Sequence, residues 1–371
     1  AQFAISIVLL VGTGVVFEQL RFMREKNLGF HKEQIVVLPI ETAAGQAQFE
    51  TLRSELLRHP NIVSVAASSS VPGRMFGDNA HRPEDAPPEI VYSLQTLGVS
   101  FDYLNTMDIP LVAGRSFSEN FPTDSTNALI INETAARHMG WTAQTAISKR
   151  LTALGGTPDQ NDTRTIIGVI KDFHFEALHL EIKPMVLSIH PRWFGNVSVR
   201  IRPENIAATL GFLQEHWQSF EPGYPWRYTF LDEDFGRLFQ REERLSQIFG
   251  VFTLLAVFIA CLGLFGLASF IAEQRTKEIG VRKVLGATVQ SIVTLLTKEF
   301  TKLVGFAFVL ATPIAYFVMK NWLQNFAYRA DMNPLLFLSA GVLALIIAWL
   351  TVGYQALKAA LTNPVEALRY E

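Results

Sequence analysis

The chain has 371 residues, of which 49% are apolar and 18% are charged. Soluble domains carry roughly 25% charged residues, and here the apolar excess is concentrated in residues 1–17 and in the last third of the chain. The net charge is −2 and no basic cluster is visible, which excludes a nucleic-acid-binding protein. We therefore expect a membrane protein that carries one water-soluble domain and has no nucleic-acid partner.

Cys261 is the chain's single cysteine and lies in an apolar run, so we expect disulfides to contribute nothing. Ala1, rather than Met, opens the chain inside an apolar stretch. A signal peptide would need a basic flank and a small-residue cleavage site. We therefore expect residues 1–17 to be a truncated first membrane helix.

Four segments are predicted to cross the lipid bilayer, which takes roughly 20 apolar residues in a helix. They are residues 1–17, 248–272, 303–319 and 335–357. Residues 248–272 contain no charge, which argues against the alternative of buried core helices. Pro313 lies inside the third segment, and membrane helices tolerate such a proline.

Small residues recur at four-residue spacing in two of these segments. Ala340, Ala344 and Ala348 lie on one face of the last span, and Ala256 and Ala260 on one face of the second. Such stripes let helices approach closely in lipid, so we expect both to be helix contacts.

The orientation follows from Lys and Arg in the short loops, which favour the cytoplasm. The loop 273–302 has six of them, and the loop 320–334 has Lys320 and Arg329. We therefore predict that 273–302 and the tail 358–371 are cytoplasmic, and that 18–247 and 320–334 are outside. Arg21, Arg24 and Lys26 disagree, because they follow the first span on the predicted outer side.

Residues 18–231 are predicted to form a mixed α/β domain. A strand at 35–38, a helix at 45–58 and a strand at 62–65 form one unit, and 197–201, 204–219 and 226–230 repeat it. Two such units around an insert at roughly 90–190 predict one subdomain split by another. The insert contains strand patterns at 128–132 and 164–170.

Residues 232–247 are predicted to form a stalk helix. Phe235, Leu238 and Leu245 keep a near-heptad spacing, and no Gly-Pro break precedes the apolar run at 248. We expect the stalk to enter the bilayer as one rod.

No nucleotide-binding loop, dinucleotide motif or nucleophile elbow is present. We therefore predict no catalytic or cofactor-binding residue, and expect ATP and Mg²⁺ to be bound by a separate subunit. His174 and His179, near Asp172 and Glu176, have a spacing that a metal site could use, but a turn explains them equally well. We predict no metal site.

The most informative stretch is residues 273–288, an amphipathic basic segment in which Gly286 suits a helix end and Thr288 can cap the next helix. An ordinary positive-inside loop is the alternative. The candidate residues for contact with an ATPase are Arg275, Thr276, Lys277, Glu278, Ile279, Gly280, Arg282, Lys283, Leu285 and Gly286.

The run 275–287, R-T-K-E-I-G-V-R-K-V-L-G-A, resembles the cytoplasmic coupling helix of FtsX-like permeases. Residues 19–30, 261–267 and 363–369 also resemble MacB-like permeases of the Bacteroidota type. The resemblance spans essentially the whole chain. It implies a multi-pass α-helical membrane protein with four transmembrane helices and an extracytoplasmic domain of the MacB periplasmic core type. It also suggests the second half of a tandem permease, with a single-unit permease as the alternative.

The resemblance further implies partners and a function. The partners would be an ABC ATPase subunit of the MacB, FtsE or LolD type, a second permease half or a homodimer partner, and a periplasmic adaptor with an outer-membrane channel. The expected function is transmission of ATP-driven change across the inner membrane for export or efflux. The alternative is an FtsX-like regulatory permease that controls a cell-wall hydrolase or a sensor.

Overall fold

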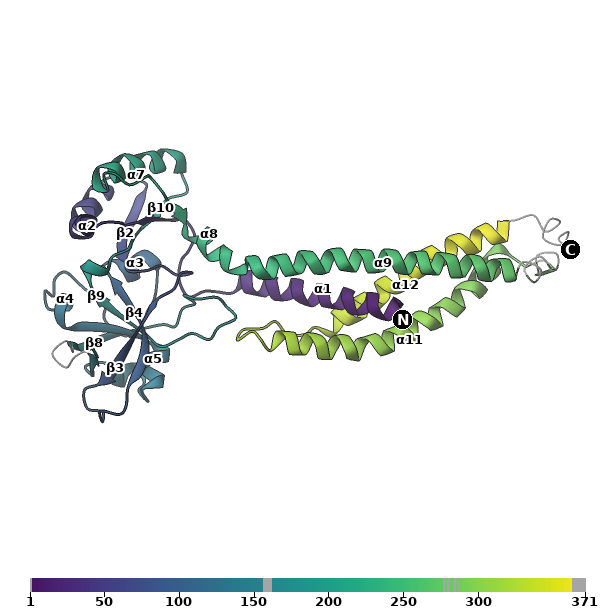
Figure 1. Cartoon of the computed structure of the whole chain (residues 1–371), viewed down its shortest axis with the longest axis horizontal. Coiled ribbons are helices and arrows are strands. Elements are labelled where there is room, and N and C mark those ends of the chain that lie inside the picture. Colours follow the sequence, from purple (N-terminus) through teal and green to yellow (C-terminus); the bar gives the residue numbers. More distant parts are fainter. Residues whose placement is uncertain are drawn as a thin grey trace. The chain divides into compact units, whose positions relative to one another are not determined.

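The computed structural model describes residues 2–155, 162–275, 278, 281–282, 285 and 287–361. The chain divides into two compact units, one formed by Ala1–Glu25 with Gln240–Glu371 and the other by Lys26–Phe239. Figure 1 labels their elements. We call them the helical unit and the soluble unit.

Four long helices build the helical unit: α1 (Gln2–Glu25), α9 (Gln240–Gln274), α11 (Val289–Leu323) and α12 (Pro334–Leu361). Among the described residues, each of the four has a segment long and apolar enough to cross a membrane. The helices extend beyond the predicted spans because polar residues continue them at both ends. In particular, residues 289–302, which lie in the predicted cytoplasmic region, belong to α11, in keeping with the helix cap predicted at Thr288.

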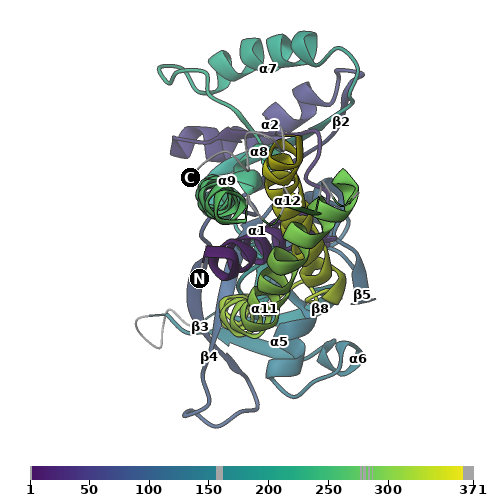
Figure 2. The same cartoon turned by 90° about the vertical axis from the view of Figure 1, so that its right-hand side faces the viewer.

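The helices pack through small side chains, as predicted for two of them. Ala340, Ala344 and Ala348 on α12 are buried, and so is Ala260 on α9, whereas Ala256 is half-buried. A further stripe on α11 was not predicted and consists of Ala307, Ala311 and Ala315. Viewed end-on in Figure 2, α1 lies among the other helices, and it contacts all three.

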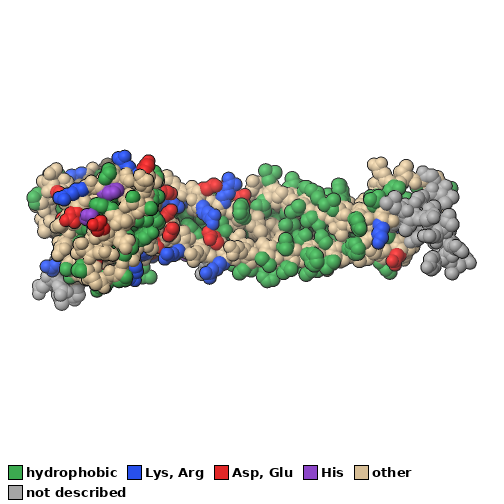
Figure 3. Space-filling view, turned by 90° about the horizontal axis from the view of Figure 1, so that it is seen from above, with side chains coloured by type: hydrophobic (Ala, Val, Ile, Leu, Met, Phe, Trp, Pro, Cys, Tyr) green, Lys and Arg blue, Asp and Glu red, His purple; other side chains and the backbone are tan. Residues whose placement is uncertain are grey.

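The outward faces of these helices carry large apolar side chains. Leu254, Phe258, Phe306 and Leu350 are all more than half exposed. Figure 3 shows hydrophobic side chains covering much of the surface of the helices. A polypeptide surface of this kind is stable in lipid rather than in water.

The soluble unit begins and ends in four antiparallel strands, which in the described residues are part of one 11-stranded sheet that continues into the insert where Ser68 pairs with Val99. The four strands are, in order, β11 (Thr229–Phe230), β1 (Ile35–Pro39), β10 (Asn196–Ile201) and β2 (Ile62–Ser68). Helices α2 (Ala43–Leu56) and α7 (Ile206–Phe220) pack on one face of these strands, over Val36, Val65 and Val199. The predicted pair of strand–helix–strand units is therefore confirmed.

The insert between β2 and β10 forms a closed ring of six strands. They are β4 (Tyr92–Val99), β3 (Gly77–Pro83), β7 (Arg150–Ala153), β8 (Asp162–Ile170), β6 (Ala128–Asn132) and β9 (Met185–Ile189), and parallel pairing of β9 with β4 closes the ring. The strands of the insert begin at Gly77, earlier than the predicted boundary near 90, because β3 pairs with β4 as a hairpin.

Shorter elements complete the insert. The strand β5 (Leu111–Gly114) pairs with β8 outside the ring. The remaining elements are α3 (Tyr103–Met107), α4 (Asp124–Asn127), α5 (Glu133–His138), α6 (Ala143–Ala146) and the 3₁₀ helix η2 (Pro191–Trp193).

The predicted continuous rod is confirmed from Gln240, because α9 runs from the predicted stalk into the predicted span without a break, but its predicted start at Asp232 is wrong. A short helix, α8 (Leu231–Gly236), is followed by a 3₁₀ turn, η3 (Arg237–Phe239), and α9 begins at Gln240. Gly236 is a weak helix former, and 3₁₀ turns commonly end helices. The chain therefore changes helix type where it passes from the soluble unit into the helical unit.

Candidate functional site

The predicted ATPase-docking segment follows the end of α9. The Arg275 amide donates to the Ile271 carbonyl, which prolongs the last turn of that helix. Glu278 and Arg282 form an ion pair of 2.8 Å, and both side chains are nearly half exposed. Thr276, Lys277, Ile279, Gly280, Lys283 and Gly286 lie outside the described residues.

The apolar side chains described in this segment face solvent. Leu285 is 81% exposed and Val281 is 50% exposed. Thr288 caps α11, as predicted, because its hydroxyl accepts from the Ser291 amide at 3.3 Å. An exposed ion pair beside an exposed leucine makes a small surface of mixed chemistry, which a protein partner could cover.

Helices α1 and α9 are joined by hydrogen bonds inside an otherwise apolar contact. The Thr253 hydroxyl donates to the Leu9 carbonyl at 3.2 Å and lies 2.7 Å from the Thr13 hydroxyl. The Ser6 hydroxyl donates to the Ala256 carbonyl at 3.2 Å. Each polar side chain is thus satisfied by the neighbouring helix, which fixes the register of the two helices.

Gln19 joins α1 to the loop between α11 and α12. Its amide nitrogen donates to the Tyr328 carbonyl at 2.9 Å, and its amide oxygen accepts from the Ala330 amide at 2.7 Å. The side chain is fully buried. Both ends of this buried amide are therefore used to hold one loop conformation. Sequence reasoning included Gln19 only as part of a family resemblance and missed this role.

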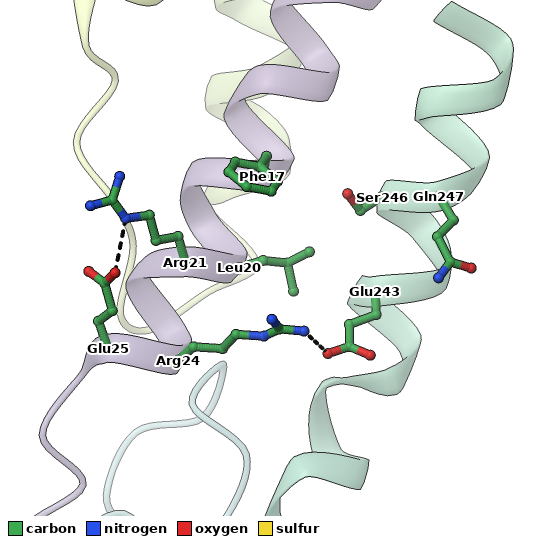
Figure 4. A pocket seen from close by; sticks show the side chains of 8 residues that line it. All are labelled: Phe17, Leu20, Arg21, Arg24, Glu25, Glu243, Ser246 and Gln247. Carbon is green, nitrogen blue, oxygen red and sulfur yellow. Dashed lines mark hydrogen bonds and ion pairs between the residues drawn. The ribbon is translucent and has the colours of Figure 1, made fainter. Parts of the chain in front are cut away.

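A groove of about 380 Å³ lies between the polar ends of α1 and α9 (Figure 4). Arg24 forms an ion pair with Glu243 across it, and Arg21 pairs with Glu25 on α1. Phe17 and Leu20 supply its apolar wall. The arginines that disagreed with the predicted orientation therefore have carboxylate partners within the helical unit, which reduces their weight as topology signals.

A polar cluster fastens α8 within the soluble unit. Arg74 donates to Asp234 at 2.5 Å, to Asn196 at 2.9 Å and to Thr229 at 3.3 Å. The Asp234 side chain is 5% exposed and also accepts from the Thr229 hydroxyl. The adjacent Gly73 has a positive φ of 91°, and its backbone lies against Phe235. Sequence reasoning missed this cluster, because its members are far apart in the chain.

The residues with metal-like spacing have other roles. Asp172 accepts from the Thr134 amide and hydroxyl and from Arg137, at 2.8 to 2.9 Å. His174 is buried, and burial followed by the charge of Lys26 lowers its pKa to about 4. Among the described residues, no group of three His, Cys, Asp or Glu side chains could hold a metal ion.

The sequence is similar to a known protein family and to a bacterial permease. Residues 250–364 match the model of the FtsX-like permease C-terminal family. The chain is 22% identical over 288 residues to YknZ, an uncharacterized ABC transporter permease of Bacillus subtilis (strain 168), and this alignment covers 74% of the chain and 69% of the relative.

Three solved structures are similar at low TM-score. The periplasmic region of MacB from Actinobacillus actinomycetemcomitans is 13% identical, with a TM-score of 0.40, and the match covers 57% of this chain and 94% of that one. A domain of a putative permease protein from Porphyromonas gingivalis is 18% identical (0.36; 51% and 84% covered). The extracellular domain of the ABC-type transporter YknZ from Gram-positive bacteria is 18% identical (0.33; 47% and 87% covered).

The predicted fold class is confirmed: four candidate membrane helices accompany a mixed α/β domain. The chain is therefore a membrane protein that carries an FtsX-like permease domain and is homologous to an ABC transporter permease.

Proposed function

We propose that this chain is a permease subunit that transmits ATP-driven conformational change across the inner membrane to its soluble unit. ATP and Mg²⁺ would bind a separate ATPase subunit, which would dock on residues 275–286. A second permease half or a second copy would complete the assembly. Export or efflux, with an adaptor and an outer-membrane channel, is the process we favour.

The observation that carries the proposal is the exposed Glu278–Arg282 pair beside the exposed Leu285. This surface follows α9, whose other end continues through η3 into the Arg74–Asp234 cluster of the soluble unit. Because η3 connects α9 to α8 in the chain, a displacement of α9 would reach the soluble unit at α8. Within the soluble unit, Arg74 links α8 to Asn196 of the sheet.

A charge swap tests docking while it keeps the ion pair. Arg282→Glu alone would place two glutamates four positions apart, and like charges at this spacing repel each other. The double change Glu278→Arg with Arg282→Glu keeps an opposite-charge pair at the same two positions and inverts the charge pattern that a partner meets. Like charges brought together at an interface cost several kcal/mol, so we expect the ATPase subunit no longer to co-purify.

The matched control is the swap Arg21→Glu with Glu25→Arg, which inverts another exposed pair at the same spacing. It should leave co-purification and ATPase activity in nanodiscs unchanged. If the variant with the 278/282 swap co-purifies with the ATPase subunit as well as the wild type does, residues 273–288 are only a positive-inside loop.

The proposal also requires residues 18–247 to be outside the cytoplasm. In a Cys261→Ala background, Asn120→Cys and Leu285→Cys place single thiols at exposed positions on the two predicted sides. An impermeant thiol reagent should label position 120 in intact cells and position 285 only after lysis. The opposite pattern would reverse the orientation.

A further inference from the structure

The inside of the six-stranded ring changes from apolar to polar along its length. Alternate residues of a strand point to the same face, so each strand contributes inward side chains at two-residue spacing. Leu94, Ile166 and Val186 pack together in one buried cluster. Two residues along the same strands, the side chains of Thr96, Arg164 and Ser188 line a cavity, whose apolar wall is formed by Val186 and Leu129 of the cluster. One end of the ring therefore holds polar groups where a small closed sheet is usually filled by apolar ones.

The cavity has a volume of about 50 Å³. Its polar lining comes from the four strands β3, β4, β8 and β9 and consists of Asn79, His81, Thr96, Asp162, Arg164, Ser188 and His190, the last directly after β9. Trp193 stacks on His190 with ring centroids 4.0 Å apart, and the missing side chain of Gly98 lets the Cβ atoms of both residues approach the strand. A water molecule needs roughly 10–15 Å³ measured in this way, and drug-sized ligands occupy roughly 300–1,000 Å³. The cavity therefore has room for one small polar group.

Arg164 is the unusual member of this lining. The residue is 8% exposed. Its Nε donates to Asp162 at 2.7 Å and its Nη2 to His190 Nε2 at 3.1 Å. Its Nη1 is buried and has no hydrogen-bond partner among the described residues. A guanidinium remains charged at all physiological pH values, and a buried donor without an acceptor is costly.

The two histidines of the cavity do not supply an acceptor for the Arg164 Nη1. The His81 Nδ1 lies 3.0 Å from the Asn79 carbonyl, so this nitrogen is the protonated one and its ring is oriented by the backbone. Burial lowers the pKa of His81, and burial with the charge of Arg164 lowers that of His190, so both rings are neutral near pH 7. The cavity thus combines the paired charges of Arg164 and Asp162 with neutral polar groups, and the ion pair uses the Arg164 Nε, so Nη1 still lacks an acceptor among the described residues.

We propose that this ring end is a binding site for a single small oxyanionic group, a carboxylate or a phosphate, held by Arg164. Such a group supplies the acceptor that Nη1 needs, and arginine binds carboxylate and phosphate oxygens in charge-assisted hydrogen bonds. Because Asp162 already offsets part of the arginine charge, we expect binding to be weaker than at an arginine without a carboxylate partner. The site is independent of the proposed ATPase contact.

The experiment uses the full chain in nanodiscs and titrates inorganic phosphate, acetate or chloride at constant ionic strength. Calorimetry gives the affinity, and the thermal midpoint of the soluble unit gives a second readout. We expect phosphate or acetate, and not chloride, to bind and to raise the midpoint. Tighter binding of acetate would identify a carboxylate ligand, and tighter binding of phosphate a phosphorylated one.

Three variants separate this site from a structural role of Arg164. Arg164→Gln should weaken oxyanion binding by roughly tenfold or more, because one charge-assisted hydrogen bond is lost. Asp162→Asn removes the competing carboxylate and should tighten oxyanion binding. This variant tests the site even if Arg164→Gln does not fold. The control Arg150→Gln changes an exposed arginine of the same ring and should bind as wild type does.

Two results would overturn the site. One is oxyanion binding that is unchanged in both Arg164→Gln and Asp162→Asn. The other is no binding in either the wild type or Asp162→Asn, which would mean that the cavity holds only water.

Discussion

Arg74 and Asp234 are 160 positions apart in the chain, and their side chains meet at 2.5 Å in the soluble unit. Arg74 is 40% exposed while the carboxylate is buried. Asn196 on β10 and Thr229 on β11 share the arginine. The short helix that precedes α9 is therefore tied to two strands through Arg74, and to β11 also by the Thr229–Asp234 hydrogen bond.

Removing that side chain should loosen α8. Arg74→Gln leaves the Asp234 carboxylate buried with weaker partners, and because Arg74 is partly exposed the cost should be about 1–2 kcal/mol rather than that of a fully buried pair. Hydrogen exchange of residues 231–236 in the full chain should accelerate accordingly. Arg227→Gln, which breaks an exposed pair with Glu41, is the control and should leave exchange unchanged.

Gln19→Leu should release the loop between α11 and α12. The Tyr328 carbonyl and the Ala330 amide would lose their partner, and an unsatisfied buried backbone group costs about 1–3 kcal/mol. We expect faster exchange at 328–330 and a lower thermal midpoint in nanodiscs. The same substitution at the exposed Gln247 should do neither, and equal effects at the two positions would argue that any added leucine is harmful.

Ala348→Leu should separate α12 from its neighbours. Ala348 is completely buried, and adding bulk to a packed contact costs about 1–3 kcal/mol. The thermal midpoint of the helical unit should fall, whereas Val342→Leu on the exposed face of the same helix should not change it. A tolerated Ala348→Leu would show that the stripe is not a close helix contact.

His174 should make the soluble unit less stable in acid. Its pKa is about 4 in the folded chain against an ordinary value of 6.5, so between these values the unfolded state binds more protons. The stability that depends on neutral His174 is complete above about pH 6.5 and is lost as the pH falls towards 4. The thermal midpoint of His174→Gln should therefore vary less with pH than that of wild type, whereas His179→Gln should keep the wild-type slope.

Local patterns were sufficient to predict the elements that bury one continuous face. The strands at 35–38 and 197–201 and the helix at 204–219 have apolar residues at the spacing expected of a strand or a helix. The four apolar segments are long enough to be recognised as membrane spans from their length. The ring of the insert could not be predicted in this way. Its closure depends on β9 pairing with β4, and no local signal marks which strands pair over that distance.

The candidate site was predictable only in part. The segment 275–287 is continuous in sequence, so its composition and resemblance were visible. Arg164 and His190, by contrast, appear as ordinary polar residues until the ring brings them within 3.1 Å. The sequence did contain a signal of burial, because Arg164 is two residues from the buried Ile166 and so lies on the same face of its strand. That signal identifies Arg164 as an inward-facing residue only when the inward face of the strand is already known.

Gln19 has a consequence for how the protein is made. The helix α1 leaves the ribosome before α11, yet the two backbone groups that satisfy its buried glutamine lie after α11. Gln19 lies just beyond the predicted span 1–17, so until that loop has been made its amide can be satisfied only by water at the membrane surface. Nascent chains that stop before residue 328 should therefore insert α1 with a hydrated Gln19, and the loop would displace that water only after α11 has been synthesised.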